Sequence, residues 1–189
     1  MTSLFLDNLA EHQEMTTRLA ALDGVVQSAG ELLARVLAAG GKLLFCGNGG
    51  SAADSQHLAS ELTGRFIKDR RPLAGIALST DSSALTCIGN DYAFEEVFAR
   101  QLTALARSGD GLVAISTSGN SANVIRAVEA ARAAGVFVVG MLGRDGGKLA
   151  ALCDVAIVVP HTTTARIQEA HILVGHTLCG IIEAELGLG

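Results

Sequence analysis

The stretch KLLFCGNGGS, residues 42–51, predicts the change from strand to loop that decides the fold. Its first five residues have the length and apolar content of a buried strand. The glycines that follow let the backbone approach a ligand closely, and a helix that begins next presents free N–H groups to that ligand. We therefore expect a strand, a loop that suits a phosphate or a polar sugar, and a helix over about 52–62.

Further apolar runs with the length of buried strands lie at 74–78, 111–115, 136–141 and 155–159. The segments between successive runs are long enough for helices, notably at 94–106 and 121–134. Apolar strands that alternate with amphipathic helices indicate βαβ units and a parallel sheet covered on both faces. The predicted fold class is α/β, with five parallel strands in a doubly wound order such as 2-1-3-4-5.

Helical segments flank this predicted sheet in the sequence. Apolar residues at three- and four-residue spacings predict two helices over 3–39, with a break near Asp23 and Gly24. The segment 164–186 has room for about six turns and predicts one long helix. No repeat, low-complexity segment or linker interrupts the sequence, so we expect a single domain over 1–189, with 1–39 as its N-terminal helices.

The composition excludes several classes of function. The formal net charge is −5 and the pI is about 5.5, so the sequence lacks the basic surface that binding to nucleic-acid phosphates requires. No apolar run approaches the roughly 20 residues of a membrane span, and acidic residues precede the first basic one, Arg18, unlike a signal peptide. We expect a cytoplasmic protein that binds neither nucleic acid nor membranes.

The cysteines are widely spaced and form no CxxC pair. They lie at Cys46, Cys87, Cys153 and Cys179, in apolar surroundings. This pattern predicts buried thiols in a reducing compartment rather than a disulfide framework.

A second polar loop, STSGNS at 116–121, follows the third predicted strand and also opens onto a helix. Its hydroxyls and the positive end of that helix offer neutral donors to an anion. Neither this loop nor 47–51 contains a P-loop or a GxGxxG fingerprint, which disfavours nucleotides. Ser121 as a simple N-cap and 47–51 as a tight turn remain the structural alternative. Two such loops at one sheet edge favour ligand binding. A third, weaker candidate is the loop around Gly89, Asn90 and Asp91.

Candidate acid–base and metal-binding residues lie on two predicted helices. His57 and Glu61 are four residues apart, so their side chains share one helix face, as two ligands of one metal ion or as a base and its partner. A surface pair is the alternative. Gln168, His171 and His176 lie on the last helix among apolar residues, where a histidine is more often a hydrogen-bonded core residue than a ligand.

Four segments together resemble a known family. They are GNGGSAADSQHLASELTGRF at 47–66, IGNDYAFEEVFARQ at 88–101, STSGNSANV at 116–124 and RIQEAHILVGH at 166–176. The combination is similar to the bacterial phosphoheptose isomerases, which have the sugar isomerase (SIS) fold, and the resemblance covers almost the whole chain.

The resemblance implies a homotetramer with active sites between subunits and one metal ion per subunit, usually zinc. It implies His57, Glu61, Gln168 and His176 as metal ligands, and Glu61 and His176 as the acid–base pair. The implied substrate contacts are Asn48, Gly49, Gly50, Ser51, Glu61, Arg65, Asn90, Asp91, Ser116, Thr117, Ser118, Ser121 and Gln168. On a straight helix Gln168 and His176 lie about 12 Å apart along the axis, so their sharing one ion calls for a distortion near Gly175 or a frayed first turn.

The implied reaction is aldose–ketose isomerisation through an enediol. It converts sedoheptulose 7-phosphate to D-glycero-D-manno-heptose 7-phosphate for ADP- or GDP-heptose and surface glycan synthesis, including lipopolysaccharide. One alternative is a non-catalytic SIS protein that binds a replication initiator, although that relative lacks residues matching Glu61 and His176. Others are a sugar-phosphate-binding regulator and an isomerase for a shorter sugar.

Overall fold

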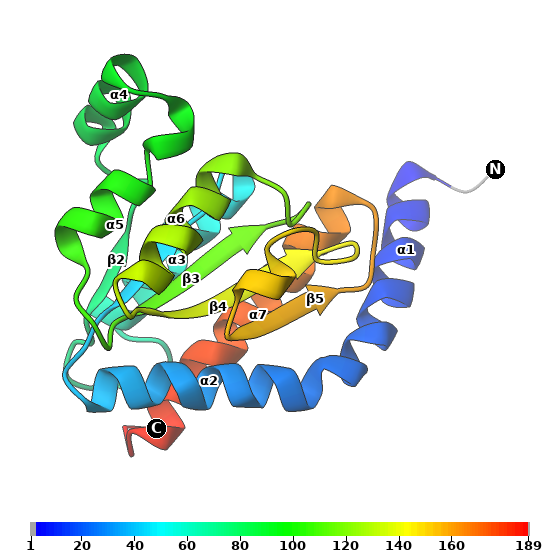
Figure 1. Ribbon diagram of the computed structural model, residues 1–189. Helices are drawn as coiled ribbons and strands as arrows, with labels where there is room; N and C mark the ends of the chain where they lie inside the picture. The colour runs from blue at the N-terminus through cyan, green and yellow to red at the C-terminus, as the bar shows by residue number, and fades with distance from the viewer. Residues whose placement is uncertain (1–2, 189) are drawn as a thin grey trace.

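The computed structural model describes residues 3–188 (Figure 1). These residues form one five-stranded parallel sheet in the order β2-β1-β3-β4-β5, which confirms the predicted topology. The strands are β1 (Leu43–Cys46), β2 (Gly75–Ala77), β3 (Gly111–Ser116), β4 (Phe137–Gly143) and β5 (Val155–Val159). The longer helices are α1 (Leu4–Leu19), α2 (Asp23–Ala38), α3 (Gly50–Thr63), α4 (Ser82–Asp91), α5 (Ala99–Leu105), α6 (Ala122–Ala133) and α7 (Thr164–Glu185).

The helices cover both faces of the sheet, as a doubly wound fold requires (Figure 1). Alternate residues of β3 point to opposite faces. Val113 and Ile115 pack with α2, α3 and α7, whereas Leu112 and Ala114 pack with α5 and α6. The α3 and α7 helices therefore share one layer, and each begins beyond the carboxyl end of a strand. Within the described residues, no helix combines the length and apolar character needed to cross a membrane.

Several predicted boundaries differ from the structure. The break between the first two helices is the 3-10 turn Ala20–Leu22, earlier than predicted, and Gly24 lies inside α2. The segment 94–106 is a 3-10 turn, Phe94–Glu96, followed by the short helix α5 rather than one helix.

The α4 helix was not predicted. The Asp81 carboxylate caps it by accepting a hydrogen bond from the Ala84 N–H at 2.9 Å. A side-chain cap satisfies a donor at the helix start and stabilises a helix of modest intrinsic propensity. Asn90 and Asp91 thus form the end of a helix, and the prediction of a loop at 89–91 was wrong.

The prediction of buried thiols holds for Cys46 and Cys179, but Cys153 is half-buried and Cys87 is exposed. Cys87 is exposed because α4 projects from the body of the molecule (Figure 1). Burial raises the pKa of the Cys46 and Cys179 thiols to about 12. Both thiols are therefore protonated and unreactive at neutral pH.

Candidate active site

The two predicted ligand loops lie together at the carboxyl edge of the sheet. Asn48, in the loop after β1, and Asn123, in the first turn of α6, exchange two side-chain hydrogen bonds of 2.8 Å. Asn123 is buried, so this amide pair fixes the Gly-rich loop against the serine loop. The structure therefore brings 47–51 and 116–121 together, as the topology predicted.

The serine loop is arranged around the N-terminus of α6. Ser121 occupies the N-cap position, but its hydroxyl makes no capping hydrogen bond and instead lies 3.0 Å from the Ser116 hydroxyl. The Ser118 hydroxyl lies 3.5 Å from that of Ser116. Ser121 is therefore not a simple side-chain cap, and the loop hydroxyls gather at the positive end of a helix, which suits an anion.

The α3 and α7 helices run side by side in the same direction, as helices that follow parallel strands in one layer do. Gly50, at the start of α3, lies against Gln168, because an added Cβ would be 2.3 Å from the Gln168 amide nitrogen. Further along, a Cβ on Gly175 would be 2.7 Å from a Leu58 methyl carbon. Glycine at these two positions permits the close helix contact on which the site depends.

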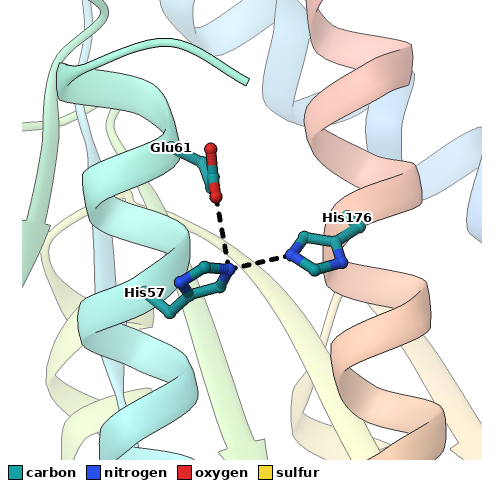
Figure 2. Close-up of side chains that lie close together, drawn as sticks. All are labelled: His57, Glu61 and His176. Atoms are coloured by element: carbon teal, nitrogen blue, oxygen red, sulfur yellow. Dashed lines mark hydrogen bonds and ion pairs between the residues drawn. The ribbon is translucent and has the colours of Figure 1, made fainter. Parts of the chain in front are cut away.

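Midway along this contact, His57 and Glu61 from α3 point toward His176 from α7 (Figure 2). The Nε2 atom of His57 lies 2.8 Å from the Nε2 atom of His176 and 3.2 Å from a Glu61 carboxylate oxygen. One ligand atom from each residue lies within 4.8 Å of the others, which suits a single metal ion. Two imidazole nitrogens and a carboxylate oxygen form a common ligand set for a divalent transition metal.

The short distance between the two imidazole nitrogens restricts their protonation. Two protonated Nε2 atoms would direct their N–H groups at each other, so at most one carries a proton at this separation. A shared proton or a cation satisfies both lone pairs. The His57 side chain is 46% exposed and that of Glu61 18% exposed, so the cluster is open to ligands from one side.

Two residues near the cluster were missed by sequence reasoning. Asp54 lies three residues before His57 on α3, and its Oδ2 atom is buried without a hydrogen-bond partner among the described residues. Burial raises the pKa of Asp54, while His57 and His176 oppose the rise. The Phe66 ring stacks on His176, with ring centroids 5.5 Å apart. The i, i+3 spacing offered a signal for Asp54, but no local pattern pointed to Phe66.

Gln168 lies apart from the cluster along the helix axis, with its amide against Gly50. The α7 helix is regular from Thr164 to Glu185, so neither the distortion expected near Gly175 nor a frayed turn at Gln168 is present. Gly175 instead provides room for Leu58.

His171 is the core histidine that the prediction allowed for. It is fully buried, and its Nε2 atom lies 3.0 Å from the Leu142 carbonyl oxygen. Burial lowers the pKa of His171 to about 4, so the imidazole is neutral at pH 7 and donates its Nε2–H to Leu142.

The neutral state of His171 predicts a stability loss in acid. Because the folded pKa lies below the unfolded value of 6.5, the unfolded state binds the extra proton between these values. The free energy of unfolding is therefore expected to fall by up to about 3 kcal/mol as the pH drops from 6.5 to 4. Urea unfolding at several pH values measures this slope. His171→Gln is expected to reduce the slope, and equal slopes in His171→Gln and the parent would contradict the assignment.

The remaining predicted contacts lie outside this cluster. The exposed Arg65 follows α3 and donates a hydrogen bond of 3.2 Å to the Ile67 carbonyl. Asn90 and Asp91 are exposed and bond to each other at 2.8 Å on α4, which stands away from α7 in Figure 1. Within one chain, the structure brings the two loops together and, further along α3, brings His57 and Glu61 to His176. The α4 residues join neither group.

Comparison of the sequence and the structure with known proteins identifies the family of this chain. The SIS domain profile matches residues 7–143. Phosphoheptose isomerase from Helicobacter hepaticus is 54% identical over 187 residues, covering 99% of this chain and 95% of that protein. The structure of phosphoheptose isomerase from Neisseria gonorrhoeae has a TM-score of 0.91 at 50% identity, covering 95% of this chain and 97% of that one. Phosphoheptose isomerase from Francisella tularensis has a TM-score of 0.93 at 38% identity, covering 97% and 100%. The chain therefore belongs to the phosphoheptose isomerase family of SIS-domain proteins.

Proposed function

We propose that this protein is an aldose–ketose isomerase that converts sedoheptulose 7-phosphate to D-glycero-D-manno-heptose 7-phosphate. The observation that carries the proposal is the cluster of His57, Glu61 and His176, held by α3 and α7, on a chain whose α3 begins at one of two adjoining loops suited to a sugar phosphate. Its family relatives are named for this activity. We place the protein in the cytoplasm, in heptose synthesis for surface glycans, with residues 1–189 acting as one SIS domain.

The two loops at the sheet edge form the proposed phosphate and sugar subsite. The hydroxyl groups of the serine loop and the N-terminus of α6 bind the phosphate oxygens, while Asn48 and the backbone at Gly49 and Gly50 contact sugar hydroxyls. The complete proposed set of substrate contacts is Asn48, Gly49, Gly50, Ser51, Glu61, Arg65, Asn90, Asp91, Ser116, Thr117, Ser118, Ser121 and Gln168.

The proposed metal ion is zinc, one per subunit, held by His57, Glu61 and His176. Three protein ligands with an open position are typical of catalytic zinc sites, and the spacing of the ligand atoms fits. Gln168 is the fourth proposed ligand. Its amide lies against Gly50, so its coordination would require the side chain or α7 to move toward the cluster. When bound, the metal supplies a Lewis acid that stabilises negative charge on the substrate oxygens.

Proton transfer is the proposed role of Glu61 and His176. Isomerisation of the ketose removes a proton from C1 and gives a 1,2-enediol, and return of a proton to C2 yields the aldose. Glu61 removes and returns the carbon-bound proton. His176 would exchange the proton between the two oxygens through Nδ1, the ring nitrogen that metal binding at Nε2 leaves free. Metal binding and base action compete for the Glu61 lone pairs, so the carboxylate uses one oxygen for each role.

A homotetramer with active sites between subunits is part of the proposal. Leu4, Phe5 and Leu6 of α1 and Leu173 of α7 are more than half exposed, an apolar surface that a second copy would cover. Asn90 and Asp91, which project on α4, would then reach the site of a neighbouring subunit.

The proposal is tested by incubating the zinc-loaded protein with sedoheptulose 7-phosphate and following aldose formation. Turnover of the heptulose phosphate, with at least about tenfold lower kcat/KM for ribulose 5-phosphate and fructose 6-phosphate, is expected because pocket shape discriminates between sugars by about this factor or more. Preference for a shorter sugar would reassign the substrate. Absence of turnover by a folded, zinc-loaded protein would reject the isomerase and favour a binding role.

A further inference from the structure

We infer that the buried ion pair of Arg70 and Glu183 is a positioning device that holds Glu61 and His176 at their working separation. This inference rests on the proposed function of that pair. The Arg70 Nε atom lies 2.7 Å from a Glu183 carboxylate oxygen, and the two side chains are only 2% and 3% exposed. Burial of two charges carries a large desolvation cost, which further hydrogen bonds must offset.

The remaining Arg70 donors hold the end of α3 to which Glu61 belongs. The guanidinium donates to the carbonyl oxygens of Glu61 at 2.7 Å and of Leu62 at 2.8 Å. These carbonyls belong to the last turn of α3, where no helical N–H group is available to them. Arg70 thus acts as a C-terminal cap, and its positive charge is favourable at that end of the helix. It fixes the backbone of the residue proposed as the base.

The Glu183 carboxylate connects the same pair to His176. Its Oε1 atom also accepts a hydrogen bond of 3.3 Å from the backbone N–H of Phe66. The Phe66 ring in turn stacks on the His176 imidazole, with an interplanar angle of 24°. Glu183 follows His176 by two turns of α7 and therefore lies on the same helix face.

The pair is therefore connected to both helices of the cluster shown in Figure 2. Arg70 bonds to the Glu61 backbone, and Glu183 bonds to Phe66, whose ring stacks on His176. Adhesion between α3 and α7 does not require it, since Leu58, Leu178 and Ile182 already form an apolar contact there. A buried ion pair often stabilises a fold no better than apolar residues of similar volume. The ion pair contributes something that apolar contacts do not: its hydrogen bonds are directional and therefore fix the position of α3 relative to α7.

A matched pair elsewhere serves as the control. Lys42 and Asp110 form a second ion pair of low exposure, 21% and 5%, with an Nζ–Oδ2 distance of 2.5 Å. It ties the amino ends of β1 and β3, and its hydrogen bonds join Lys42, Arg107 and Asp110 rather than residues of α3 or α7. Lys42→Met breaks this pair and leaves the Asp110 charge with its backbone hydrogen bonds alone, so it is expected to perturb the fold while leaving the α3–α7 contacts in place.

The test compares Arg70→Met/Glu183→Leu, Arg70→Lys and Lys42→Met. The double variant avoids an unpaired buried charge, and Arg70→Lys keeps the charge but loses the planar fork. In both Arg70 variants, kcat for sedoheptulose 7-phosphate and the affinity for Zn²⁺ are expected to fall about 10- to 100-fold, the range for residues that orient ligands. The Zn²⁺ affinity is measured by competition with a chromophoric chelator. KM is expected to change less than about threefold, because the substrate loops are untouched. Lys42→Met is expected to keep parental kcat and Zn²⁺ affinity.

Parental kcat and Zn²⁺ affinity in a folded double variant would overturn the inference, as would equal losses in Lys42→Met. If the double variant does not fold, Arg70→Lys decides by the same criteria. Phe66→Leu should reproduce part of the loss, and its effect should be less than multiplicative with that of Arg70→Lys. If the parent does not turn over sedoheptulose 7-phosphate, the proposed function fails while the Zn²⁺ affinities still decide the inference.

Discussion

Glu61→Gln is expected to lower kcat by about 10³-fold while the protein stays folded, because a positioned acid–base group contributes about 10²–10⁴-fold. Glutamine has nearly the same shape as glutamate and can still accept a hydrogen bond, but it cannot take a proton from carbon. The variant is also expected to lose exchange of the C1 proton of sedoheptulose 7-phosphate with D₂O. This exchange is measured by NMR and reports proton abstraction separately from product release.

The matched control is Glu14→Gln. Glu14 lies on α1, where it forms an exposed ion pair with Arg18, and an exposed pair of this kind contributes little to stability. We expect this variant to retain parental kcat and proton exchange. Rapid C1 exchange in Glu61→Gln would show that another group removes the proton. Asp54, whose carboxyl interacts electrostatically with His57 and His176, would be the first candidate.

His57→Ala is expected to weaken Zn²⁺ binding by more than about 100-fold, since changes outside the ligand shell alone cost about 10–100-fold. His57 is a proposed ligand with no proposed proton-transfer role, so excess Zn²⁺ is expected to restore part of the kcat. Removal of the metal from the parent by a chelator should give the same activity loss, reversed by Zn²⁺. Binding is measured by chelator competition and activity by aldose formation.

His12→Ala is the control for the metal site. His12 also pairs with a carboxylate, with its Nδ1 atom 2.7 Å from Glu169, but it lies on α1 and outside the cluster. Its loss should leave Zn²⁺ affinity unchanged. Parental Zn²⁺ affinity in His57→Ala would show that the cluster is not the metal site and would leave His57 as a hydrogen-bond partner of His176.

The features that sequence predicted are those governed by local patterns. Each strand is a short apolar run, and the alternation of strands with helices predicted the parallel, doubly wound sheet. The i, i+4 spacing placed His57 and Glu61 on one face of α3. The failure at α4 is also local in origin. Ala84, Leu85 and Ile88 have helical spacing, but Gly89, Asn90 and Asp91 were interpreted as turn residues and the Asp81 cap was not recognised. The exposure of Cys87 follows from that missed helix.

The contacts that sequence did not predict join distant parts of the chain. Phe66 stacks on His176, and Arg70 bonds to Glu183. In each contact the first residue precedes β2 in the sequence and the second follows β5. Nothing local distinguishes an arginine that caps a neighbouring helix from one on the surface. Gly175 shows the same dependence on contacts between distant residues. Its sequence context suggested a helix distortion, whereas in the structure the absence of a side chain leaves room for Leu58.

The cluster is divided between α3 and α7, and this division affects when the protein can first become catalytically active during its synthesis. His57 and Glu61 leave the ribosome early, and the strands of the sheet are complete at Val159. His176 lies on α7, which follows the last strand. A nascent chain therefore contains every strand of its sheet and both substrate loops before it has an acid–base pair. Under the proposed mechanism, isomerase activity begins only when α7 has docked beside α3.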